Sequence, residues 1–131
     1  MGVVRRFAGG SGFHRPEGEV GPFRWDGVTV EPYAPGVSEG TRQVLIGPAE
    51  SAPNFAVRYF EVPPGRPAPL DSHAHDHGVV VLQGRGRVRL GDDEHAIGFG
   101  DVIYVAPHEP HAFEADGPEP LGFLCVVPAR R

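Results

Sequence analysis

Short apolar runs separated by turn-forming residues recur along most of the chain. In residues 55–62, the side chains at 56, 58, 60 and 62 share one face and those at 55, 57, 59 and 61 share the other. This period of two predicts a β-strand. Further strands are expected at residues 28–33, 43–46, 79–82, 86–90, 102–105, 112–115 and 121–127.

Glycine and proline mark the ends of these runs. The 131 residues include 19 glycines and 15 prolines, and no long stretch free of them carries the 3.6-residue apolar period of a helix. An all-β domain with this many short strands must bury their inner faces against each other. The sequence therefore predicts a sandwich, a jelly roll or a closed barrel.

Length and composition bound the organisation and the partners. We expect residues 1–22, which lack alternation, to form an arm or an edge strand, and residues 23–131 to form one barrel domain. The net charge of −5 argues against nucleic acid as a partner. No apolar run reaches the roughly 18 residues that a membrane span needs, and the amino terminus lacks a secretory signal. We therefore expect a cytoplasmic protein that binds a small molecule.

The candidate chemistry lies in two histidine clusters. The first contains His73, His75 and His77, preceded by Asp71, and the second ends at His111. Imidazole nitrogens bind divalent transition metals. Cys125 is the only cysteine, which excludes an internal disulfide and a thiolate-cluster metal site.

These clusters and their surroundings resemble the two signature motifs of the cupin superfamily. The resemblance covers about residues 25–128, and its most specific part is the spacing of Gly100 and His111 in the second motif. It implies an all-β fold with a single jelly-roll β-barrel, one divalent metal ion and a homodimer. Fe(II) is the metal we favour, with Mn, Ni, Cu and Zn as alternatives.

The first motif departs from the family pattern and leaves two registers open. Counting back from Gly84 without a gap puts His77 in the slot of the usual glutamate, and His73 and Asp71 in the two histidine slots. The other register takes His73 and His75 as the histidine pair. The expected ligands are therefore His73, His77 and His111, with Asp71 or His75 as the fourth.

Three other residues are weaker candidates for a catalytic role. Arg58 is the one charge on an otherwise apolar strand face, so it either grips an anionic substrate or pairs with an acid. His108 is either an acid or base at the barrel mouth or an exposed turn residue. Tyr104 is a further candidate, as either core or pocket wall.

The resemblance leaves the activity open, because this superfamily includes several enzyme classes and non-catalytic proteins. We expect an enzyme of the non-haem Fe(II) dioxygenase type, acting on a small organic substrate with dioxygen as co-substrate. A metal with three or four protein ligands keeps open positions for both. The alternatives are a metal-assisted isomerase or lyase, and a non-catalytic module that binds a small ligand or a metal.

Overall fold

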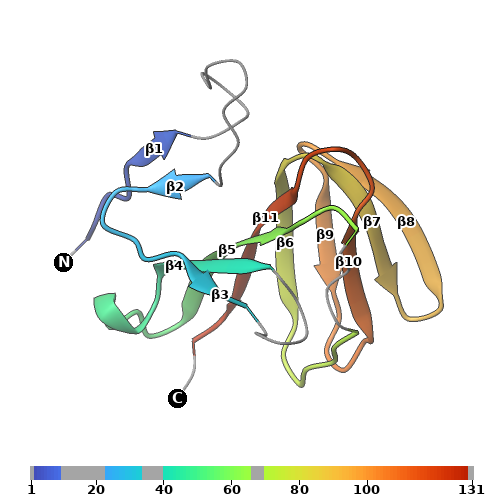
Figure 1. The fold of residues 1–131 in the computed structure, drawn as a ribbon. Coiled ribbons are helices and arrows are strands. Elements are labelled where there is room, and N and C mark those ends of the chain that lie inside the picture. Colours follow the sequence, from blue (N-terminus) through green and yellow to red (C-terminus); the bar gives the residue numbers. More distant parts are fainter. Residues whose placement is uncertain (1, 10–22, 34–39, 66–69, 130–131) are drawn as a thin grey trace.

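The computed structural model describes residues 2–9, 23–33, 40–65 and 70–129 (Figure 1). Within these residues the chain is almost entirely β-structure, with one 3₁₀ turn, η1 (Pro48–Glu50). None of the helical structure described is long and apolar enough to cross a membrane. In chain order the strands are β1 (Phe7–Gly9), β2 (Arg24–Trp25), β3 (Glu31–Pro32), β4 (Thr41–Ile46), β5 (Phe55–Val62), β6 (His77–Gln83), β7 (Arg85–Leu90), β8 (Asp93–Gly98), β9 (Val102–Val105), β10 (His111–Ala115) and β11 (Leu121–Pro128).

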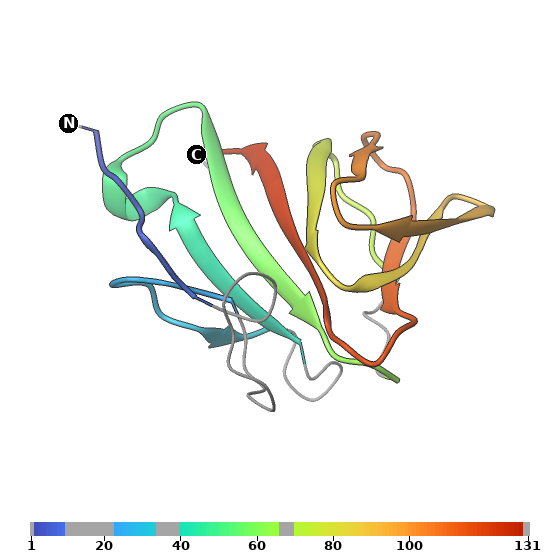
Figure 2. The ribbon, with the colours of Figure 1, turned by 90° about the horizontal axis from the view of Figure 1, so that it is seen from above.

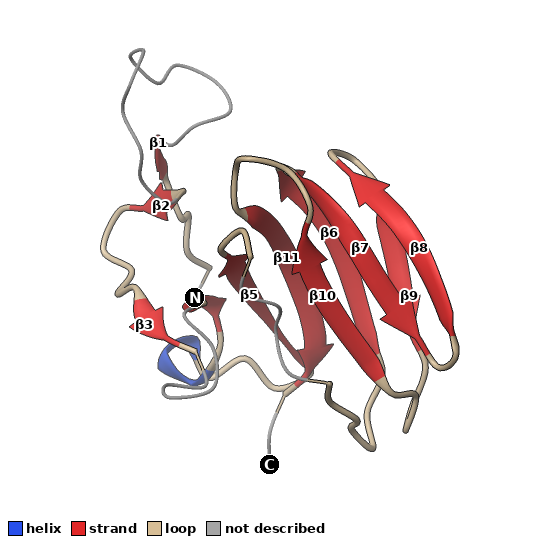
Figure 3. Cartoon of the chain, turned by 45° about the vertical axis from the view of Figure 1, so that its right-hand side comes forward, coloured by secondary structure: helices blue, strands red, loops and turns tan. Residues whose placement is uncertain are grey.

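Most of these strands form two antiparallel sheets. The larger sheet has the order β3-β4-β5-β11-β6-β9, and Figure 2 shows β4, β5 and β11 side by side within it. The smaller sheet has the order β10-β7-β8 (Figure 3). From β6 onward the chain crosses repeatedly from one sheet to the other, as in a jelly roll. The predicted all-β jelly-roll class is confirmed.

The main hydrophobic core lies between the two sheets. One end of this core is polar. Along β6, His77, Val79 and Val81 are buried while the residues between them are less so, and β10 shows the same alternation from His111 to Phe113. Alternating side chains point to the same face of a strand. His77 and His111 therefore face inward, at the ends of two rows of core residues.

The opposite face of β5 is also buried. Phe23 stacks on Tyr59 with 5.7 Å between the ring centroids. Beneath this stack, the Phe23 N–H donates to Glu61 Oε2 at 2.8 Å, and the Tyr59 hydroxyl lies 3.0 Å from the same oxygen. Side chains on this face of β5 are thus packed and hydrogen-bonded, so β5 is buried on the face opposite the main core as well.

Most of the expected strands overlap strands of the structure, but β2, residues 28–33 and β8 differ from the expectation. No strand was expected at Arg24–Trp25, which form β2. Two of the expected strands, at 55–62 and 102–105, coincide with β5 and β9. The strand expected at 28–33 is wrong for most of its length, because pairing with β4 is confined to Glu31 and Pro32. The sequence also missed β8, which pairs with all of β7 although Ile97 is its only buried residue. With one solvated face, β8 looks like a charged turn in the sequence.

The predicted arm, residues 1–22, lies partly outside the described residues, which omit 10–22. Of the part that is described, β1 pairs with β2 of the same chain. The domain division and the homodimer stay predictions.

Gly84 joins β6 to β7 at a point where the chain changes sheet. Its φ of +70° is left-handed, and an added Cβ would lie 2.2 Å from the Pro120 carbonyl oxygen. We expect Gly84→Ala to lower the free energy of unfolding by about 2 kcal/mol or more, from backbone strain and overlap. Chemical denaturation measures this loss. Gly98→Ala is the matched control, since nothing lies within 4 Å of the Cβ that it adds. Equal stabilities of the two variants would contradict the prediction.

Candidate metal centre

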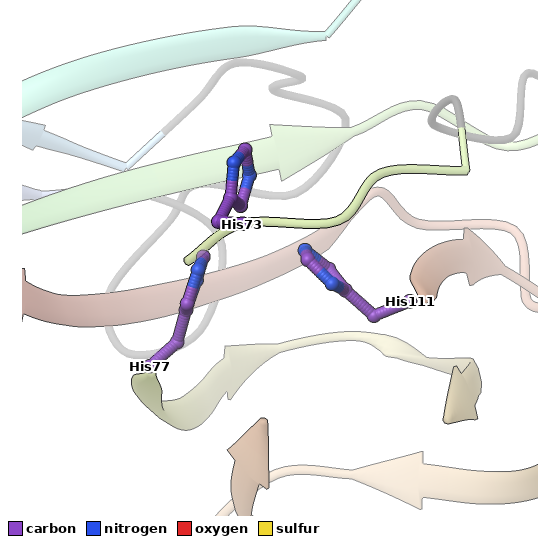
Figure 4. Close-up of side chains that lie close together, drawn as sticks. All are labelled: His73, His77 and His111. Atoms are coloured by element: carbon purple, nitrogen blue, oxygen red, sulfur yellow. The ribbon is translucent and has the colours of Figure 1, made fainter. Parts of the chain in front are cut away.

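Three of the predicted ligands converge at the polar end of the interior. His73 lies in the loop before β6, His77 begins β6 and His111 begins β10, and their side chains point toward one another (Figure 4). One ligand nitrogen from each lies within 4.8 Å of the other two. Three imidazoles around one point can bind a single divalent ion.

Backbone hydrogen bonds bring His73 to the other two. Asp71 and His111 form an isolated antiparallel bridge in which each N–H donates to the other residue's carbonyl at 2.9 Å. The His108 N–H donates to the His73 carbonyl, and the Ser72 hydroxyl donates to the His108 carbonyl at 2.9 Å. Two separate loops are thereby held together, so the position of His73 depends on β10.

The buried imidazole of His77 is in the neutral form that binds a metal. Burial, and then the neighbouring histidines, lower the pKa of His77 to about 4, so its ring is neutral at pH 7. Its Nδ1 lies 3.5 Å from the Cys125 Sγ, and its Nε2 is buried with no hydrogen-bond partner among the described residues. His111 Nδ1 lies 3.0 Å from the Glu109 carbonyl, to which it donates when it carries the proton. This donor set fits a divalent transition metal.

Both predicted residues, Asp71 and His75, lie close enough to the histidines to be the fourth ligand. Asp71 Oδ2 lies 3.2 Å from His73 Nε2, while the His75 ring stacks 4.8 Å from the His77 ring, centroid to centroid. Residues 72–76 are not a strand, so the expectation that neighbours two apart point the same way does not apply to them. Asp71 therefore lies beside His73, and His75 lies beside His77, so each register has its fourth residue in contact with one of the three histidines.

A cavity of about 490 Å³ opens onto the histidines. Its volume lies within the range of small-molecule sites. Tyr33, Phe60, Phe113 and Phe123 form much of its apolar wall. Asp71, His75, Arg42, Arg58 and Cys125 also line it. A small polar molecule could therefore contact the histidines while lying against an apolar wall.

Of the three weaker candidates, Arg58 lines this cavity and the other two do not. Tyr104 is 61% exposed on β9, and its hydroxyl donates to Asp76 at 2.8 Å. His108 occupies an exposed turn with a φ of +63°. The geometry gives neither residue contact with a substrate in the cavity, so their catalytic roles stay predictions without structural support.

The sequence did not point to two residues that line the cavity, Tyr33 and Arg42. The face of β4 on which Arg42 lies becomes evident only from its pairing, in which Arg42 is opposite Phe60 of β5. Tyr33 follows β3, and its ring packs edge-on against Phe60 at 4.9 Å. Alternation within one strand cannot reveal these contacts.

Comparison with known proteins extends beyond the site. The Cupin_2 family model, a cupin domain, matches residues 58–127. The 1-methylthio-D-xylulose 5-phosphate methylsulfurylase of Rhodospirillum rubrum is 40% identical over 116 residues, covering 83% of this chain and 71% of that protein. The crystal structure of a cupin-2 domain from the same organism gives a TM-score of 0.77 at 37% identity, covering 85% of this chain and 76% of that one.

A second solved structure belongs to a protein with a different named activity. The polyketide cyclase RemF from Streptomyces resistomycificus gives a TM-score of 0.73 at 31% identity, covering 80% of this chain and 76% of that one. The residues matched by the family model include Arg58, His77 and His111. The chain belongs to the cupin family.

Proposed function

We propose that this chain is a metal-dependent enzyme that acts on a small phosphorylated sugar carrying a methylthio group. The observation that carries the proposal is the three-histidine cluster that lines a partly apolar cavity of about 490 Å³. The substrate class is that in the name of the Rhodospirillum rubrum relative, which is 40% identical over most of this chain.

In this proposal His73, His77 and His111 hold the metal, and Asp71 or His75 completes the set. A divalent ion held there supplies Lewis-acid polarisation of a substrate carbonyl. The aromatic wall excludes water from the bound molecule, which strengthens every polar contact inside the cavity. Cys125 and the Glu109 carbonyl contact the outer nitrogens of His77 and His111 and so orient both rings.

The Fe(II) dioxygenase expected from the sequence stays a prediction. Neither named enzyme reported above, the methylsulfurylase or the cyclase, carries an oxygenase name. We therefore place metal-assisted chemistry at a carbonyl, the class of the isomerase or lyase alternative, ahead of oxygen activation.

Metal binding is the first requirement. We expect the purified chain to bind about one divalent ion, and His77→Ala or His111→Ala to weaken binding by about 100-fold or more, since each removes a buried ligand. Competition titration with a chromogenic chelator measures the affinity. His95→Ala is the control, because His95 is exposed on β8. Unchanged affinity in both buried variants would exclude this cluster as the metal site.

The same titration separates the two registers. The gapless register expects Asp71→Ala to weaken metal binding about tenfold or more and His75→Ala to have little effect. Loss of affinity in His75→Ala with a normal Asp71→Ala would show that the other register is the correct one.

Activity is tested with 1-methylthio-D-xylulose 5-phosphate and the chain reconstituted separately with Mn(II), Fe(II), Ni(II) and Zn(II). We expect metal-dependent consumption of the substrate, seen as loss of its methylthio proton resonance, and none with His77→Ala. Oxygen uptake with enols, catechols or keto acids, without consumption of the sugar phosphate, would replace the proposal by the dioxygenase. If the chain is inactive in every assay, the proposal is replaced by the alternative of a non-catalytic binding module.

A further inference from the structure

We propose that Arg58 and Arg42 form an oxyanion subsite in the cavity and bind the phosphate group of the substrate. This inference rests on the proposed function and deepens it, because it assigns residues to one part of the substrate. The argument depends on the position, burial and partners of the two guanidinium groups.

Arg58 is a charged residue with no acidic partner among the described residues. It lies on the inward face of β5 and lines the cavity. Its guanidinium carbon lies 5.0 Å from the centre of the Phe60 ring, and its Nη2 lies 3.6 Å from the Cys125 Sγ. Its Nε is buried without a hydrogen-bond partner in the described structure. A partly buried cation with no counter-charge in the described structure is favoured when a ligand supplies the anion.

Arg42 lies beside it on the neighbouring strand. Arg42 is opposite Phe60, and Val44 is opposite Arg58, so the two arginines occupy diagonal positions on one face of β4 and β5. Arg42 Nη2 pairs with Glu31 Oε2 at 3.1 Å, but its Nε is buried without a partner among the described residues. The one carboxylate of this pair thus contacts Arg42 only, and the Nε of each arginine is a buried donor without a partner among the described residues.

The pair is close enough to the histidines for one small molecule to reach both. Cys125 Sγ contacts Arg58 on one side and His77 Nδ1 on the other, so a single sulfur atom separates the guanidinium from that ring. The cavity of about 490 Å³ contains both groups. A substrate with a phosphate at one end and a carbonyl near the other could span this distance.

The charge of the pair selects the class of anion. Two neighbouring guanidinium groups match a phosphate monoester, which carries close to two negative charges at pH 7 and offers several acceptor oxygens. A single carboxylate would use fewer of the donors. We therefore assign the subsite to phosphate and expect carboxylates to bind more weakly.

The test is binding of inorganic phosphate to the full chain, without turnover. Isothermal titration with and without EDTA should give the same phosphate affinity to within about twofold, because the arginines and not the metal bind it. Arg58→Met should weaken phosphate binding about tenfold or more, and Arg42→Met severalfold. Arg58→Lys should fall between the parent and Arg58→Met, because it keeps the charge and loses the planar fork.

Arg87→Met is the matched control, since Arg87 pairs with Glu114 on the exposed surface of the smaller sheet. Phosphate binding that Arg58→Met leaves unchanged, or acetate binding as tight as phosphate binding, would overturn the assignment. If the arginine variants fail to fold, the proposal is tested on the unsubstituted chain. Phosphate should raise its melting temperature and acetate at equal ionic strength should not, and equal effects of the two would again overturn the proposal.

The outcomes for the subsite and for the proposed function are separate. Phosphate binding lost in Arg58→Met, in a chain that does not consume the methylthio sugar phosphate, supports the subsite and contradicts the function. If the chain consumes that substrate but Arg58→Met leaves its phosphate affinity unchanged, the function is supported and the subsite is contradicted.

Discussion

Two backbone hydrogen bonds between Asp71 and His111 hold the candidate site together. His77 and His111 face inward because they begin strands whose alternate residues form the core. His73 has no strand of its own, and its position is set by this bridge and by the contact of its carbonyl with the His108 N–H. The strands position His77 and His111, and the bridge positions His73.

The cavity built on this arrangement has two polar ends with opposite requirements. At one end, imidazole nitrogens are suited to a metal cation, and burial lowers the pKa of His77 so that its ring is unprotonated at pH 7. At the other end, the guanidinium groups of Arg42 and Arg58 are suited to an oxyanion. The Cys125 Sγ lies between Arg58 and His77, and Phe60 packs against Arg58, Tyr33 and Phe123. Because β5 is buried on both faces, these inward side chains rest on a rigid strand.

How far the sequence predicts the molecule depends on whether a feature is local. The alternation at 55–62 and the spacing of Gly100 and His111 are local patterns, and both correspond to the structure. β8 was missed because its outward face is solvated and its only buried residue is Ile97. The fourth ligand could not be chosen, because residues 72–76 form an irregular loop whose side-chain directions follow no period. Arg42 depended on strand pairing, which no single segment reveals.

The central claim is that His73, His77 and His111 bind one metal ion inside the cavity. An anomalous difference map from a crystal grown with Mn(II) tests it most directly. The account predicts a single strong peak per chain, at a coordination distance of about 2.0–2.4 Å from a nitrogen of each of the three histidines. A map with no peak at this cluster, or with manganese bound at exposed residues such as His95 or His108 and not between the three rings, would contradict it.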